Sequence, residues 1–150
     1  MPDDRTIVER ALSTECGSAV VSDAFITPAN RDILRRTARS TAEPMTRRGR
    51  AIYLLRYWSD DETVATLEDV IDGVDEEARI AAASALGHIG TTRTLQAIER
   101  LAADPSADVR RVAINSLGRL DTPEATTILR NAARADSSEL NRTRAADLLQ

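Results

Sequence analysis

Alanine and leucine recur in the C-terminal two-thirds of this chain with a period of 31 residues. The block 78–87 reappears at 109–118, and a weaker copy precedes it at 47–56. Apolar positions three and four residues apart lie on one face of a helix. Those that match across the copies are Ala51, Leu55, Trp58, Ala82, Leu86, Ile89, Ala113, Leu117 and Leu120. The pattern predicts first helices at about 45–58, 76–89, 107–120 and 139–149.

A second apolar stripe with the same offset lies between these helices and predicts a second helix in each repeat. Its members are Val64, Leu67, Val70, Ile71, Leu95, Ile98, Leu101, Ala102, Ala125, Ile128, Leu129 and Ala132. Ser59 followed by Glu62 suggests a capping box, and Thr122-Pro123 suggests an N-cap and a first-turn proline. Gly87 and Gly118 lie within a turn of where left-handed caps are expected.

Residues 1–44 are less regular, with short helices expected at Thr6–Ser13 and Pro28–Arg39. Residues 18–26 suit either a degenerate first helix or an extended segment, since they hold Val20, Val21 and Phe25. We expect one domain, 1–150, in which 1–44 form a degenerate capping repeat and 45–150 form about three and a half repeats. The fold class is all-α, since two helices per 31-residue unit are typical of an α-solenoid.

Composition narrows the choice of partner and compartment. All 20 basic residues are arginine, through codon bias or through selection for bidentate pairing, and the net charge of −4 disfavours nucleic acid. Cys16 is the single cysteine, and no apolar run is long enough to span a membrane. These features favour a soluble protein in the cytoplasm, with no disulfide framework and no membrane span.

Residues capable of catalysis or metal binding are sparse. His88 is the single histidine and aligns with Tyr57 and Arg119, so it is expected at a variable surface position. Cys16 lacks a histidine nearby in the sequence, and no glycine-rich phosphate loop is present. We therefore expect no catalytic residue, no metal and no cofactor. Tyr53 and Tyr57 either pack under the N-terminal segment or form an aromatic patch for a partner.

The segment Asp104-Pro105-x-x-x-Val109-Arg110-x-x-Ala113-x-x-x-Leu117-Gly118 resembles a HEAT repeat of the short, phycobilisome-lyase HEAT-like kind. The resemblance implies a right-handed α-solenoid, an armadillo-like α–α superhelix. It also implies a ladder in which an aspartate ending a second helix meets an arginine of the next first helix. The ladder residues are Arg79, Asp104, Arg110, Asp136 and Arg142, with Gly73 at the aspartate position that would serve Arg79.

In HEAT solenoids the second helices line the concave side, which usually holds the partner. The expected partner-binding residues are Asp69, Gln96, Arg100, Thr127, Asn131 and Arg134. Their mixed charges favour a protein or peptide, so the leading expectation is a non-catalytic interaction scaffold or adaptor that is not an enzyme.

Two other functions are compatible with the sequence. One is a phycobilin lyase or chaperone-lyase, because similar repeats occur in such enzymes. The other is a DNA-handling protein, for which Trp58 with Asp60 or Asp61 is the candidate neighbourhood. The last helix, with Ala145, Leu148 and Leu149 on its apolar face, either docks on a partner or a second copy or folds back over the preceding repeat.

Overall fold

Helices are the regular elements throughout the part of the chain that the computed structural model describes, residues 3–13 and 22–150. The α-helices are α1 (Asp4–Leu12), α2 (Pro28–Arg39), α3 (Met45–Leu54), α4 (Asp61–Ile71), α5 (Glu76–Ile89), α6 (Thr92–Leu101), α7 (Ala107–Leu120), α8 (Pro123–Ala135) and α9 (Glu139–Asp147). Two short 3₁₀-helices are η1 (Asp23–Phe25) and η2 (Leu55–Tyr57). Cys16, Val20 and Val21 lie outside the described residues.

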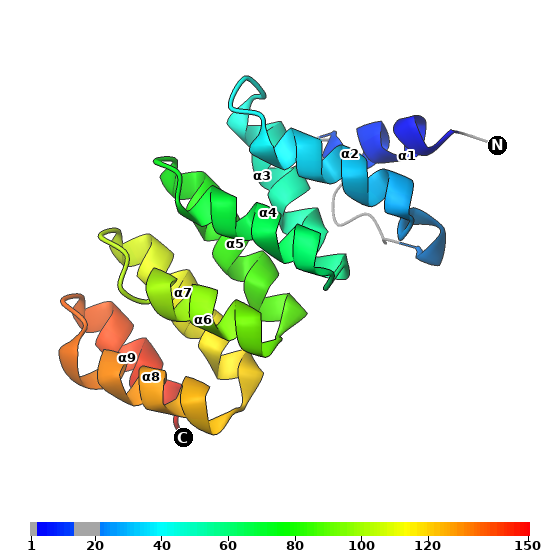
Figure 1. The fold of residues 1–150 in the computed structure, drawn as a ribbon. Coiled ribbons are helices and arrows are strands. Elements are labelled where there is room, and N and C mark those ends of the chain that lie inside the picture. Colours follow the sequence, from blue (N-terminus) through cyan, green and yellow to red (C-terminus); the bar gives the residue numbers. More distant parts are fainter. Residues whose placement is uncertain (1–2, 14–21) are drawn as a thin grey trace.

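The helices stack in two layers, as Figure 1 shows. Helices α1, α3, α5, α7 and α9 form one layer, and we call its outer surface the first-helix face. Helices α2, α4, α6 and α8 form the other layer, whose outer surface is the second-helix face. The chain is therefore an all-α solenoid of two-helix repeats, as its period predicts. No helix of the described residues has the length and apolar character needed to cross a membrane.

Side-chain caps start the second helices at a constant spacing. Thr91 follows Asp60, and Thr122 follows Thr91, by 31 residues, and all three accept a hydrogen bond from the backbone N–H three positions later. Such caps satisfy N–H groups that a helix cannot bond internally. The N-cap of α4 is Asp60, whose Oδ1 is 3.0 Å from the nitrogen of Thr63, so the capping box predicted at Ser59 is wrong by one residue.

Close packing between first helices explains Gly87, which the sequence placed within a turn of a left-handed cap. A Cβ at Gly87 would lie 2.4 Å from both Cβ and Oγ of Ser116, so its absence lets α5 approach α7. The buried Ser116 hydroxyl donates to the carbonyl of Ala83 across the same contact, at 3.0 Å. The left-handed caps themselves are Gly90, with φ of 68°, and Asp121, with φ of 42°, so they lie within a turn of Gly87 and Gly118, as the sequence predicts.

A single apolar core runs between the two layers and continues under the N-terminal pair of helices. Its largest fully buried side chains include Leu34, Ile52, Leu67, Leu86, Ile98, Ile114 and Leu117. Trp58 is half-buried against this core, with its ring centroid 6.0 Å from that of Phe25. Helix α9 packs on both α7 and α8, which buries Ala145 and brings Leu148 against Gly118.

Candidate functional site

A ladder of arginines runs along the edge where second helices turn into first helices. The Nε of Arg110, near the start of α7, donates to Asp136 Oδ2 at 2.9 Å, and its Nη1 donates to the carbonyl of Asp104 at 2.8 Å. Arg79 is bound in the same way, with 2.8 Å from its Nε to Asp104 Oδ2 and 3.0 Å from its Nη1 to the carbonyl of Val74. Each guanidinium therefore joins the loops before and after its own repeat.

The register of the ladder differs from the one implied by the six-residue spacing of Asp104 and Arg110. Arg110 takes the backbone carbonyl of Asp104, while the Asp104 carboxylate binds the earlier Arg79. Arg142 likewise donates to the carbonyl of Asp136, at 2.6 Å, and not to its carboxylate. Because the loop carbonyl supplies this contact, Arg79 needs no aspartate at Gly73. Arg48, which donates to Asp75 and to the carbonyl of Ala38, is a ladder arginine that the sequence analysis missed.

Asp136 is the most enclosed carboxylate of the ladder, with a side chain that is 2% exposed. Burial raises the pKa of Asp136, but hydrogen bonds from Arg110 and from the backbone N–H of Ser138 outweigh it and hold the pKa below the ordinary 3.8. The pKa of Arg110 is raised by the same pair. The ladder residues thus bind one another and the loop backbone, which indicates a structural role in holding successive repeats together.

Ion pairs join the second helices α2, α4 and α6 across their exposed face. Arg39 of α2 pairs with Asp69 of α4 at 2.9 Å, and Arg93 of α6 pairs with Glu68 of α4 at 2.6 Å. Arg100 of α6 pairs with Asp72, which ends α4. Two of the residues expected to bind a partner, Asp69 and Arg100, are therefore already engaged within the chain.

These pairs stop between α6 and α8, where the described residues contain no ion pair joining the two helices. The repeat period explains the change, because the residues 31 positions later have lost the complementary charges. Arg93 is replaced by Glu124, which leaves Glu99, the equivalent of Glu68, without its cation. Arg100 is likewise replaced by Asn131. The two helices consequently lack the contacts that join the preceding pairs.

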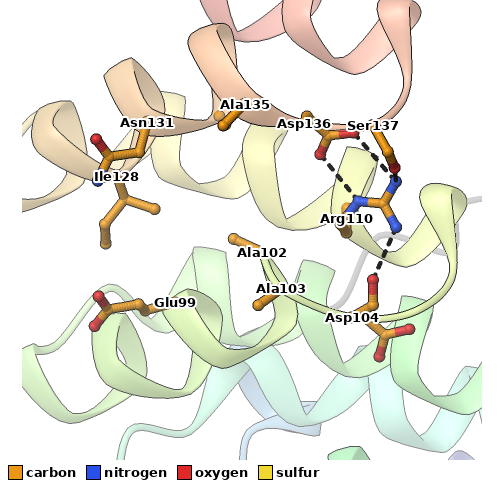
Figure 2. A pocket seen from close by; sticks show the side chains of 11 residues that line it. Glu99, Ala102, Ala103, Asp104, Arg110, Ile128, Asn131, Ala135, Asp136 and Ser137 are labelled. Carbon is orange, nitrogen blue, oxygen red and sulfur yellow. Dashed lines mark hydrogen bonds and ion pairs between the residues drawn. The ribbon is translucent and has the colours of Figure 1, made fainter.

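A groove of about 440 Å³ occupies the space between α6 and α8. Figure 2 shows Glu99, Ile128 and Asn131 at one end and the ladder residues Arg110 and Asp136 at the other. Small side chains line the groove from the turn that follows α6 and from α8: Ala102, Ala103, Ala132 and Ala135. An open channel with apolar walls and polar ends suits an extended segment of polypeptide. We take this α6–α8 groove as the candidate functional site.

The other residues expected to bind a partner are all exposed on the second-helix face. Gln96, Thr127, Asn131 and Arg134 are exposed, and of these only Asn131 lines the groove. The Thr127 hydroxyl donates to the carbonyl of Pro123 within its own helix, at 3.0 Å. The sequence analysis did not predict Glu99 as a site residue. Its equivalent in α4, Glu68, pairs with Arg93 of the next second helix, and the pattern within one helix does not show this pair.

Tyr53 and Tyr57 lie on the first-helix face, on the side away from the groove. The guanidinium carbon of Arg56 is 4.1 Å from the ring centroid of Tyr53 and 4.9 Å from that of Tyr57. These distances are in the range of cation–π contacts. Tyr53 also meets the ring of His88 edge-on, with centroids 6.3 Å apart.

The residues weighed for catalysis do not assemble into a reactive cluster. Asp60 caps α4, and burial raises its pKa while hydrogen bonds from Thr63 lower it, with a net pKa below 3.8. His88 is exposed and its Nδ1 lies 2.9 Å from the carbonyl of Ser84. Across residues 3–13 and 22–150, no group of three or more histidine, cysteine or acidic side chains could hold a metal ion.

Comparison with known proteins identifies the repeats. A sequence profile of HEAT repeats matches residues 31–114 and again 64–150. A search of curated proteins found no match. Among solved structures, human deoxyhypusine hydroxylase in complex with glycerol superposes with a TM-score of 0.67 at 20% identity, over 79% of this chain and 43% of that one. The chain thus spans less than half the length of that protein, and the likeness concerns the fold.

This likeness corrects one expectation drawn from the sequence. We expected a non-catalytic scaffold that is not an enzyme, on the reasoning that a stack of helices offers a surface and no reactive pocket. A protein with the same fold is a hydroxylase, so that reasoning from fold to absence of catalysis fails. The phycobilisome-lyase qualifier and the DNA-handling alternative are not addressed by the comparisons and stay predictions.

Proposed function

Because the chain belongs to the HEAT-repeat family, we propose that it recognises a polypeptide on its second-helix face, with a basic side chain of that polypeptide held at the α6–α8 groove. The observation that carries the proposal is the replacement of Arg93 by Glu124 at the equivalent position of the next repeat. In the preceding repeat Arg93 supplies the cation for Glu68, whereas at the equivalent position Glu124 brings a second carboxylate and leaves Glu99 without a cation.

Charge complementarity argues for a basic side chain. In the preceding repeat the Arg93 Nη2 lies 2.6 Å from Glu68 Oε2, and this pair raises the pKa of Arg93 through a charged hydrogen bond. Glu99 and Glu124 are both exposed acids with no cation of the described chain within 4.0 Å. A lysine or arginine from a bound polypeptide would meet Glu99 as Arg93 meets Glu68.

The remainder of the groove suits main chain and small side chains. Ala103, in the turn after α6, and Ala135, at the end of α8, line the two walls, so neither wall projects a bulky group there. Ile128 offers apolar surface, and the exposed Asn131 offers both a donor and an acceptor for a peptide group. This combination gives affinity through main-chain contact and specificity through the acid at one end.

Recognition of a polypeptide serves an enzyme as well as a binding protein, so the proposal does not depend on the absence of catalysis. We place the interaction in the cytoplasm, in keeping with the single cysteine, Cys16, and the reducing conditions under which free thiols persist.

The test uses peptides selected from a random phage-displayed library on the wild-type protein. Selected sequences are synthesised, and their Kd values are measured by fluorescence polarisation. Glu124→Arg restores the cation found in the preceding repeat and should weaken the best peptides by at least about tenfold, which corresponds to about 1.4 kcal/mol. Glu139→Arg is the matched control, because it makes the same charge change in the first turn of α9.

Support requires that the enriched peptides contain lysine or arginine and bind Glu139→Arg as tightly as wild type. Failure to enrich any peptide, or equal binding to wild type and Glu124→Arg, overturns the proposal. Circular dichroism of both variants checks that the helices are retained. We expect Glu124→Arg to unfold at the same or a slightly higher temperature, since an exposed ion pair contributes about 0–1 kcal/mol.

A further inference from the structure

A row of cationic and aromatic side chains crosses the first-helix face, opposite the groove. It begins with Tyr53 of α3 and Arg56 of the following η2, and it continues to His88 of α5, whose ring meets Tyr53 edge-on. Arg119 of α7 is next, with its Nη1 3.5 Å from His88 Nδ1. Arg144 of α9 extends the row, and its Nε donates to Asn115 Oδ1 of α7 at 2.6 Å. These contacts make one continuous row over four helices.

Among the described residues, the arginines of this row have no acidic partner. Arg56, Arg119 and Arg144 each lie more than 4.0 Å from every carboxylate that the structure describes. On the second-helix face, Arg39, Arg93 and Arg100 pair with acids of the neighbouring helix, whereas Arg130 and Arg134 of α8 form no ion pair with a described residue.

Two acids do occur on the same helix ends. They are Asp121, the C-cap of α7, and Asp147, at the end of α9, and neither pairs with an arginine of the row. Across residues 3–13 and 22–150, the row is therefore a surface whose cations are not neutralised by contact within the chain.

The spacing of the first helices favours a regular acidic segment. Packed helices lie about 8–10 Å apart, so a segment that crosses them passes from one first helix to the next over roughly that distance. Side chains seven residues apart on an α-helix are about 10.5 Å apart along its axis, since each residue rises 1.5 Å. Carboxylates placed once every seven residues would thus fall near each first helix that the segment crosses, and so within reach of Arg56, Arg119 and Arg144.

We propose that this row binds an acidic polypeptide segment lying across the first helices, with its carboxylates paired to Arg56, Arg119 and Arg144. Charge complementarity is the main support, because guanidinium groups form strong paired hydrogen bonds with carboxylates. The Tyr53 hydroxyl accepts a hydrogen bond from Arg56 Nη1 and can donate its own proton to a carboxylate. A nucleic acid would also present anions, but it carries a much denser charge, which a chain of net charge −4 repels.

The probe is an alanine-rich helical peptide with glutamate at every seventh residue, compared with the same peptide carrying glutamine. Binding to the full chain is measured by fluorescence polarisation at low and moderate salt. Arg119→Glu combined with Arg144→Glu should weaken the glutamate peptide at least about tenfold, since both side chains are exposed and attraction becomes repulsion. Arg130→Glu combined with Arg134→Glu on α8 makes the same change in net charge and should leave binding within about twofold of wild type.

Three results overturn the proposal: equal binding of the glutamate and glutamine peptides, equal losses in the two double variants, or tighter salt-dependent binding of single-stranded oligothymidine. The last outcome would assign the row to nucleic acid. Since the row and the α6–α8 groove lie on opposite faces, Glu124→Arg should leave the glutamate peptide bound, which keeps this test separate from that of the groove.

Discussion

Replacing Gly87 by alanine should destabilise the protein, although the same change in an ordinary helix would stabilise it. The added Cβ would lie 2.4 Å from Cβ and Oγ of Ser116 on the neighbouring helix. Carbon atoms are in favourable contact at about 3.5–4.0 Å, so α5 and α7 would have to move apart by about 1 Å. Ser116 cannot swing away, because its Cβ is fixed to the α7 backbone.

The magnitude follows from two opposing effects. Overpacking a well-packed interior costs about 1–3 kcal/mol, and this overlap belongs at the upper end. Alanine in place of glycine within a helix returns about 1 kcal/mol. The net loss is about 2 kcal/mol in the free energy of unfolding, which for this chain length lowers the Tm by roughly 4–8 °C.

Urea denaturation followed by circular dichroism at 222 nm measures this loss. Gly118→Ala is the comparison, because its added Cβ would meet the flexible end of Leu148, at 2.7 Å, and should cost less. In a double-mutant cycle, Ser116→Gly should recover part of the loss caused by Gly87→Ala. If Gly87→Ala is as stable as wild type, close approach of α5 and α7 is not the reason for glycine at this position.

Two further predictions concern the ladder. Arg110→Ala should lower the free energy of unfolding by about 3–5 kcal/mol in urea titrations, since it leaves Asp136 buried without its cation. Arg142→Ala loses one contact to a carbonyl and should cost less. Equal losses in the two variants would contradict the register of the ladder. Because the pKa of Asp136 is lowered in the folded protein, its stabilising contribution is complete above the ordinary value of 3.8 and is lost as the pH falls below it. Stability measured from pH 6 to pH 3 should therefore fall more steeply for wild type than for Asp136→Asn, and parallel curves would refute the assignment.

The sequence predicts the stack of helices well because burial repeats with the period. Ala82 and Ala113 are fully buried, as are Leu86 and Leu117 to within 1%, so one spacing rule locates both helices. Residues 18–26 lack such a rule, and only their end, at η1, is described. The packing role of Gly87 was not predicted, because it depends on Ser116, a residue 29 positions later on another helix, which local helix-ending signals do not reveal.

The candidate site was predicted only in part, for a related reason. Outward positions such as Asp69 and Arg100 were correctly placed on the surface, but their ion pairs depend on residues about 30 positions away. Likewise, the six-residue interval from Asp104 to Arg110 fits two bonding patterns, since a guanidinium can reach either a carbonyl or a carboxylate. Comparing charges between equivalent positions, as for Arg93 and Glu124, would have indicated the groove.

The contacts of the ladder also restrict the positions at which a repeat can gain or lose a residue. Asp104 and Ser106 keep the same separation as Asp136 and Ser138, and in both loops the serine N–H donates to the aspartate, at 2.9 and 2.8 Å. The period nevertheless grows by one residue between these loops, within the span of the longer helix α8. An insertion in a loop would break rungs on both sides, whereas one in a second helix leaves them intact. Evolution can therefore lengthen or reshape the second helices, and so vary the ligand, without rebuilding the frame.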